Sequence, residues 1–150
     1  MSPTAANASE GQQATNRAAK LGIKPGNLVQ SLNEDDDIAT DLLDEIVATS
    51  GNDLVPEDSD DVVDVVLLWF RDDDGDLVDA LVDGRRQLSD EGMLWLLTPK
   101  AGRDGHVEPS DILEAVPTAG LVQTSTVTAG QEWTAMRLAA PKGGANRRQR

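Results

Sequence analysis

Two apolar segments separated by one helix-length segment constrain the fold of this chain most strongly. Val62–Phe70 and Met93–Thr98 are apolar at nearly every position, which is typical of strands covered on both faces in a parallel sheet. Between them, Gly75–Leu88 carries apolar residues at helical spacing. A strand, a helix and a second strand within about 35 residues form one right-handed crossover unit. We therefore expect the two strands to lie side by side and to point the same way.

Further elements are expected on both sides of this unit. The expected helices are Asn16–Leu21, Asp35–Thr49 and Pro109–Ala119, and the expected strands are Leu28–Leu32, Asn52–Pro56, Leu121–Val127 and Glu132–Ala140. Asp36 or Asp37 stands at the N-cap position of the second helix, and Gly51 stands at its C′ position. The turn residues Ala129-Gly130 favour an antiparallel hairpin between the last two strands. This order of elements predicts an α/β protein with three layers and an antiparallel edge.

Length and composition indicate one domain in a soluble protein. The chain has 150 residues and no cysteine, so it can bury a sizeable core but has neither a disulfide framework nor a thiolate metal site. We expect a disordered N-terminal arm at 1–15, a single α/β domain at 16–142 and a disordered basic tail at 143–150. Neither a signal peptide nor a run of 18 apolar residues is found, so we expect a cytoplasmic protein without a membrane partner.

The charge is strongly acidic and unevenly distributed. The 27 acidic and 13 basic residues give a net charge of −14. All 27 acidic residues lie within residues 1–140, whereas residues 141–150 contain four basic residues and no acidic one. An acidic body repels phosphate backbones. Nucleic-acid binding is therefore expected only weakly, through Arg147, Arg148 and Arg150, and a protein is the more plausible partner.

A candidate binding site follows from the position of the two central strands. In open α/β sheets, ligands bind beyond the carboxyl ends of the parallel strands. The aromatic, charged and titratable residues expected at this edge are Trp69, Arg71, Asp72, Lys100, Arg103 and His106. Trp69 is expected to line the edge, whereas Trp95 and Trp133 are expected in the core. The edge is either a crevice for an anion or nucleotide, or a surface patch that holds the molecule's own acidic neighbours.

Motifs for metal binding and catalysis are not found. Placing Gly75 at position 6 of a calcium loop would put Phe70 at position 1 and Leu81 at position 12, and neither can ligate calcium. The acids within Asp72–Asp76 are instead interpreted as helix N-capping, with a loose divalent-cation site as the alternative. A lone His106 cannot form a histidine-based zinc site, and the chain has neither a P-loop nor a G-x-S-x-G elbow. No catalytic residue is therefore assigned.

Five blocks of sequence, in order, resemble an uncharacterised family, "domain of unknown function 3052". They are Leu21–Gly26 (LGIKPG), Asp60–Trp69 (DDVVDVVLLW), Asp72–Asp83 (DDDGDLVDALVD), Leu94–Gly102 (LWLLTPKAG) and Gly105–Asp111 (GHVEPSD). Members of this family look like small relatives of class I S-adenosylmethionine-dependent methyltransferases. The resemblance implies a three-layer, mostly parallel, Rossmann-like (methyltransferase-like) sheet whose C-terminal antiparallel hairpin is Leu121–Ala140.

The chain departs from the methyltransferase pattern after its first strand. In that fold the strand ends in a glycine-rich turn, which lets the backbone approach the methionine part of the cofactor. Here Ser31–Asp36 contains no glycine, so side chains would crowd that approach. Glu57 or Asp58 stands at the position where, in that fold, an acid would hydrogen-bond to the ribose of the cofactor. S-adenosylmethionine is thus the only cofactor that the resemblance suggests, and we expect none to be bound.

These observations rank three functional hypotheses. The first is a non-catalytic methyltransferase-like domain that acts as a protein-interaction or regulatory ligand-binding module. The alternative is an S-adenosylmethionine- or nucleotide-dependent enzyme, a small methyltransferase, with Asp72 or His106 as its acid or base. The third is a nucleic-acid accessory protein that acts through Pro141–Arg150.

Overall fold

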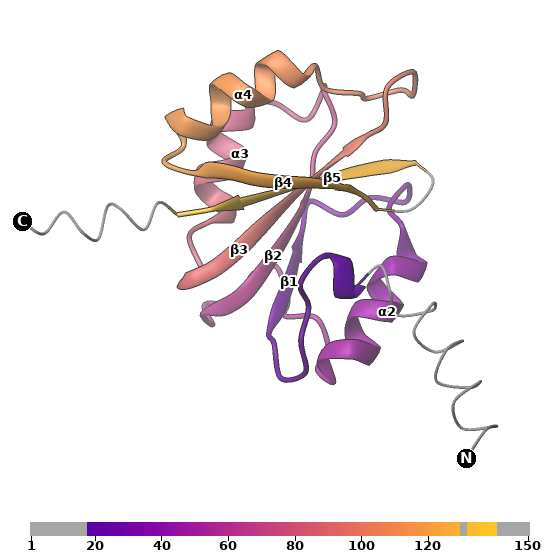
Figure 1. Cartoon of the computed structure of the whole chain (residues 1–150), viewed down its shortest axis with the longest axis vertical. Helices are drawn as coiled ribbons and strands as arrows, with labels where there is room; N and C mark the ends of the chain where they lie inside the picture. The colour runs from indigo at the N-terminus through magenta and orange to yellow at the C-terminus, as the bar shows by residue number, and fades with distance from the viewer. Residues whose placement is uncertain (1–17, 130–131, 141–150) are drawn as a thin grey trace, which may run out of the picture.

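The computed structural model describes residues 18–129 and 132–140, in which helices cover both faces of a five-stranded mixed sheet (Figure 1). The strands are β1 (Val29–Leu32), β2 (Val63–Trp69), β3 (Leu88–Pro99), β4 (Val122–Thr128) and β5 (Trp133–Ala139), and the helices are α2 (Thr40–Ser50), α3 (Leu77–Gly84) and α4 (Pro109–Thr118). The arm expected at 1–15 and the tail expected at 143–150 lie outside the described residues.

The central crossover unit is confirmed. β2 and β3 are parallel neighbours, with Val66 opposite Leu94 and Leu68 opposite Leu96. β1 is parallel to β2 on the other side. The expectation of a mostly parallel sheet is not confirmed, because β5 runs antiparallel to β3 and β4 runs antiparallel to β5. The C-terminal hairpin thus supplies half of the strand pairs, and the strand order is β1-β2-β3-β5-β4.

The central strands are apolar throughout because both faces of the sheet are covered. Val65, Leu67 and Trp69 belong to one buried cluster together with the apolar face of α2. Val66 and Leu68 belong to a second cluster, which includes buried residues of α3 and α4. Successive residues of a strand point to opposite faces, so neither face of β2 can be polar. In Figure 1, α2 lies on one side of the sheet, and α3 and α4 lie on the other.

Several element boundaries differ from the expected ones. β3 begins at Leu88 instead of Met93, because Leu88 pairs with Val63 and a bulge then separates that pair from the rest of the ladder. Gly92 lies in this bulge, where an added Cβ would come 2.8 Å from a backbone oxygen of Asp64. The segment expected as a strand at Asn52–Pro56 forms only an isolated parallel bridge, between Val55 and Gln30 of β1.

The helix ends show which acidic residues act as caps. Asp76 is the N-cap of α3, and its side chain accepts a hydrogen bond from the backbone N–H of Asp79 at 3.2 Å, as expected. α2 begins at Thr40 after Ala39, without a side-chain cap, so the expected N-cap at Asp36 or Asp37 is wrong. Gly51 ends α2 with a φ of 80°, which confirms its C′ position.

Among the residues that the structure describes, none of the helices has the length and apolar character needed to span a bilayer.

Candidate functional site

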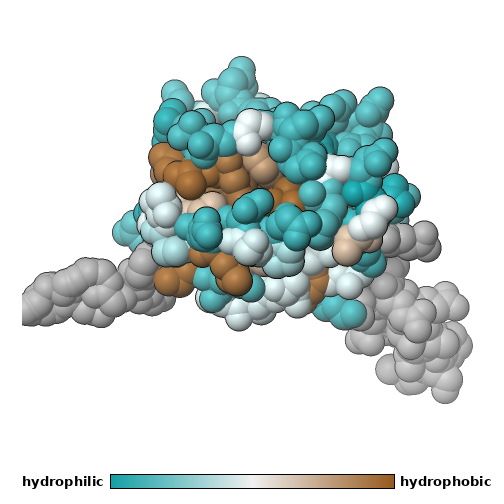
Figure 2. Space-filling model, turned by 90° about the horizontal axis from the view of Figure 1, so that it is seen from above, coloured by the Kyte–Doolittle hydropathy of each residue, from teal (hydrophilic) through white to brown (hydrophobic). Residues whose placement is uncertain are grey.

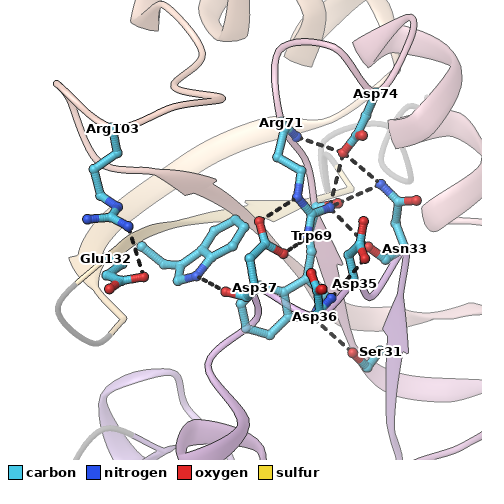
Figure 3. A network of polar contacts seen from close by, with 11 residues as sticks. Ser31, Asn33, Asp35, Asp36, Asp37, Trp69, Arg71, Asp74, Arg103 and Glu132 are labelled. Atoms are coloured by element: carbon cyan, nitrogen blue, oxygen red, sulfur yellow. Dashed lines mark hydrogen bonds and ion pairs between the residues drawn. The ribbon is translucent and has the colours of Figure 1, made fainter.

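Arg71, a buried arginine immediately after β2, is the centre of a polar network at the carboxyl edge of the sheet, and its side-chain partners are exposed residues. Its guanidinium lies between Asp37, from the β1–α2 loop, and Asp74, from the β2–α3 loop (Figure 3). Arg71 Nε donates to Asp37 Oδ2 at 3.0 Å and Nη2 donates to Asp37 Oδ1, while Nη1 donates to Asp74 Oδ2 at 3.1 Å. This bidentate geometry is the strongest form of an arginine–carboxylate pair. Arg71 is only 8% exposed, so the guanidinium forms part of the packed interior.

Asn33 ties this network to the end of β1. Its side-chain Nδ2 donates to the carbonyl of Trp69 at 2.8 Å and to Asp74 Oδ2 at 3.1 Å. Its own carbonyl accepts from Arg71 Nη1 at 3.2 Å. Asn33 has a φ of 63°, and it is the only non-glycine residue with a positive φ in the described part of the chain. Asparagine tolerates this conformation better than most residues, so β1 can end without glycine.

Two tryptophans form the apolar base of the network. The Arg71 guanidinium carbon lies 5.3 Å from the ring centroid of Trp133, within the range of a cation–π contact. Trp133 packs edge-on against Trp69, with centroids 4.9 Å apart and planes at 85°. Both indole N–H groups are satisfied: Trp133 Nε1 donates to the Asp37 carbonyl at 3.1 Å, and Trp69 Nε1 donates to Ser31 Oγ at 2.9 Å. β1, β2, β5 and the β1–α2 loop are thereby joined at one point.

Electrostatics keep the Arg71–Asp37 pair ionised. The hydrogen bonds from Arg71, and then its charge, lower the pKa of Asp37, although burial opposes this shift. The pKa of Arg71 is raised, first by its hydrogen bond with Asp37 and further by the one with Asp74, although burial opposes this shift as well. An acid or base in catalysis needs a pKa near the working pH, and both shifts move away from it. This geometry suits a fixed structural pair, with neither residue exchanging protons.

The accessible part of the edge is the loop after β3. Arg103 Nη2 lies 3.1 Å from Glu132 Oε1, and both side chains are about half exposed, at 49% and 53%. His106 Nδ1 lies 2.9 Å from the carbonyl of Pro99, so this nitrogen carries the hydrogen and donates it. The backbone N–H of Asp72 donates to the Gly105 carbonyl at 2.9 Å. The loop is therefore fastened to the segment that follows β2.

The expected site residues separate into a buried and an accessible group. Trp69 is 0% exposed, so it does not line the open edge as expected, because Trp133 packs against it. Arg71 is buried and pairs with Asp37 and Asp74 of the molecule itself. The accessible group is Asp72, Lys100, Arg103 and His106. The sequence analysis did not assign Asp37 and Asp74 as partners of Arg71, although acidic residues follow both strands.

The residues present do not fit the methionine end of S-adenosylmethionine. The β1–α2 loop has no glycine, and the position where a cofactor would approach β1 is occupied by the contacts of Asn33, Asp37 and Arg71. A cavity of about 280 Å³ lies beside this position, and its lining includes Asn33 and Glu57. That lining contains five carboxylates and no basic residue, which disfavours anionic groups there. The described residues also contain no group of three or more side chains suited to a metal ion.

Comparisons with known sequences identify the family of this chain. A family model described as "Protein of unknown function (DUF3052)" matches residues 18–142, which confirms the family resemblance expected from the sequence. An uncharacterised protein of Mycobacterium tuberculosis (strain H37Rv) and one of Mycobacterium bovis are each 49% identical over 135 residues, which is 90% of this chain and 85% of the relative.

Solved structures with a similar fold include methyltransferases. A TehB-like SAM-dependent methyltransferase from Corynebacterium glutamicum has a TM-score of 0.51 at 13% identity, and the match covers 93% of this chain and 98% of that one. Precorrin-6y C5,15-methyltransferase from Geobacter metallireducens has a TM-score of 0.56 at 10% identity, with 83% and 86% covered. At these identities the similarity shows a Rossmann-like, methyltransferase-like fold and carries no chemistry with it.

Proposed function

Because this chain belongs to the DUF3052 family of proteins of unknown function, we propose a function from the geometry of its own site. The protein is a non-catalytic domain with a three-layer, Rossmann-like fold, and it acts as a protein-interaction module. The observation that supports this proposal is the network around the buried Arg71, which lies beyond the end of β1, where a methyltransferase of this fold would bring its backbone close to the cofactor. Similarity of fold does not confer the chemistry of the neighbours.

The partner surface in this proposal is the accessible carboxyl edge of the sheet. Lys100, Arg103 and His106 lie within seven residues of one loop, in a chain whose net charge is −14. Lys100 and Arg103 are the two cations of this loop, and Arg103 already pairs with Glu132, so an acidic segment of a partner would contact Lys100 and compete with Glu132 for Arg103. Trp69, Trp133 and Arg71 pack under this edge, so we expect its surface to be rigid before the partner binds. A rigid surface lowers the entropy cost of association.

A pull-down from the native cell tests the partner surface. We expect Lys100→Ala, Arg103→Ala and His106→Ala together to abolish binding of a partner that the unmodified chain retains, because they remove both cations of the loop and its imidazole. The matched control is Lys20→Ala with Lys24→Ala, two exposed lysines on the N-terminal side of β1, which should leave binding intact. If both variants retain the same partners, or lose them equally, this surface is not the binding site.

A second candidate function is a small S-adenosylmethionine- or nucleotide-dependent methyltransferase, for which the accessible Asp72 or His106 would be the acid or base. The fold of the solved neighbours favours it, as does the cavity beside Glu57. We nevertheless expect no change in melting temperature with millimolar S-adenosylmethionine or S-adenosylhomocysteine, because the Arg71 network fills the approach to β1. A ligand at 100 times its Kd would stabilise the fold by about 2.7 kcal/mol and raise the melting temperature by roughly 5–15 °C. A rise of that size, with an authentic methyltransferase as positive control, would replace our proposal with this one.

A further inference from the structure

A groove runs between α3 and α4 on the face of the sheet opposite α2. Both helices contribute buried residues to one apolar cluster, among them Leu81 and Ile112, and the groove between them has a volume of about 450 Å³. Its apolar lining consists of Phe70, Leu77, Val78, Val107 and Ala115. Figure 2 looks down on the side where these helices lie and shows brown apolar surface between teal hydrophilic rims. The groove can therefore bind side chains that have an apolar stem and a polar end.

The rim of the groove is acidic along its length. Four of its lining residues are carboxylates, Asp72, Asp76, Asp111 and Glu114, and none is basic. The neighbouring 280 Å³ cavity shares Phe70 and Asp76 with the groove, and it too has no basic residue in its lining. An apolar floor with a carboxylate rim is complementary to arginine and lysine, whose apolar stems pack on the floor while their charged ends reach the rim.

We propose that the chain's own basic segment, residues 142–150, occupies this groove. The segment contains Lys142, Arg147, Arg148 and Arg150 and no acidic residue, so its charge is opposite to that of the rim. It is also joined to the domain. A tethered segment meets its site at an effective concentration in the millimolar range, which allows even weak ion pairs to hold it. The segment thereby shields the groove from other cations.

The end of β5 lies close enough for the segment to reach. Ala139 pairs with Val122, which follows Thr118 of the groove lining by only four residues. α4 has ten residues and is therefore about 15 Å long, whereas ten extended residues span up to roughly 33 Å. The segment after Ala140 can thus run the full length of the groove. This inference goes beyond the proposed function, because Lys100, Arg103 and His106 of the partner surface are not among the residues that line the groove.

A paramagnetic label on the full chain tests the proposal. The chain has no cysteine, so Asn146→Cys accepts a single nitroxide within the basic segment. We expect selective loss of amide signal from residues 72–78 and 107–118, with recovery when the label is reduced. Replacing Lys142, Arg147, Arg148 and Arg150 by Gln should abolish this loss, and so should high salt, because the contacts are ion pairs.

Variants of the rim and a mixing experiment identify the occupant. Asp111→Asn with Glu114→Gln should weaken the loss of signal, whereas Glu34→Gln with Asp44→Asn, an equal charge change before and on α2, should not. The proposal is overturned if no residue is broadened, if broadening centres on other acidic segments, or if both variants act alike. It is also overturned if unlabelled ¹⁵N chains mixed with labelled ¹⁴N chains show the same loss, because the occupant is then a second copy. Neither result bears on the partner surface at Lys100 and Arg103.

Discussion

Replacing Arg71 by Met is expected to lower the free energy of unfolding by about 2–4 kcal/mol at pH 7. The variant leaves Asp37 and Asp74 without their cation, and it removes hydrogen bonds to two backbone carbonyls. Breaking a fully buried pair costs more, but the side chain of Asp37 is 48% exposed and can regain water. Urea unfolding followed by far-UV circular dichroism measures the change.

The matched control is Arg86→Met. Arg86 Nη2 lies 2.9 Å from Asp83 Oδ1, a geometry close to that of Arg71 with Asp74, but both side chains are about 70% exposed. Exposed pairs contribute little, so the loss should be below about 0.5 kcal/mol. Equal losses in the two variants would show that the Arg71 network is not a structural centre.

The effect of Arg71→Met should also depend on pH. Because the folded state lowers the pKa of Asp37, the pairing contributes fully above the pKa of an unfolded aspartate, about 3.9. The contribution is lost as the pH falls through the lower folded-state pKa. Arg71→Met lacks the pairing, so its stability should approach that of the unmodified chain as the pH falls below about 4. A difference that stays constant from pH 7 to about pH 3 would mean that Asp37 does not carry the effect.

Trp133→Ala is expected to cost about 3–5 kcal/mol, because it removes a buried indole from the contact between the hairpin and the sheet. Trp133 is 3% exposed, and its ring touches both Trp69 and Arg71. Trp133→Phe keeps an aromatic ring but loses the N–H that donates to the Asp37 carbonyl. Its cost should therefore be smaller, about 1–2 kcal/mol. Urea midpoints of both variants check this order.

Leu113→Ala is the control for the loss of apolar surface. Leu113 lies on α4 and is 59% exposed, so truncating it should change stability by less than about 0.5 kcal/mol. In addition, Trp133→Ala combined with Arg71→Met should cost less than the sum of the two single changes, because residues in contact are coupled. Strict additivity would contradict the contact between the guanidinium and the indole.

The sequence was sufficient for the parts of the fold that depend on apolar pattern. β2, α3 and β3 were expected because burial on both faces leaves a continuous apolar strand, and the hairpin was expected from its turn residues. The start of β3 at Leu88 was not expected, because the polar residues 89–92 form a bulge between the Val63–Leu88 pair and the rest of the strand pairing. The acids at 35–37 were expected to begin a helix. Asp37 instead binds the Arg71 guanidinium, and α2 starts at Thr40.

The candidate site was predictable in place but not in arrangement. Strand direction alone puts Arg71, Lys100 and His106 at one edge of the sheet. Whether Arg71 is buried depends on residues that are distant in sequence. Asp37 binds Arg71 across 34 residues, and Trp133 of β5 packs against its guanidinium. Long-range contacts of this kind leave no local pattern in the sequence. The sequence therefore does not predict that Arg71 is buried, and it was expected to face a ligand.

The placement of the aromatic residues has a consequence for optical studies. The chain has three tryptophans and no tyrosine, and Trp69, Trp95 and Trp133 are all at most 3% exposed, on β2, β3 and β5. Ultraviolet-excited emission therefore arises from indoles inside the sheet alone. The emission wavelength should therefore change when the sheet unfolds, but not when a segment binds at the outer surface of α3 and α4. A fluorescence measurement can thus distinguish unfolding from binding at that surface.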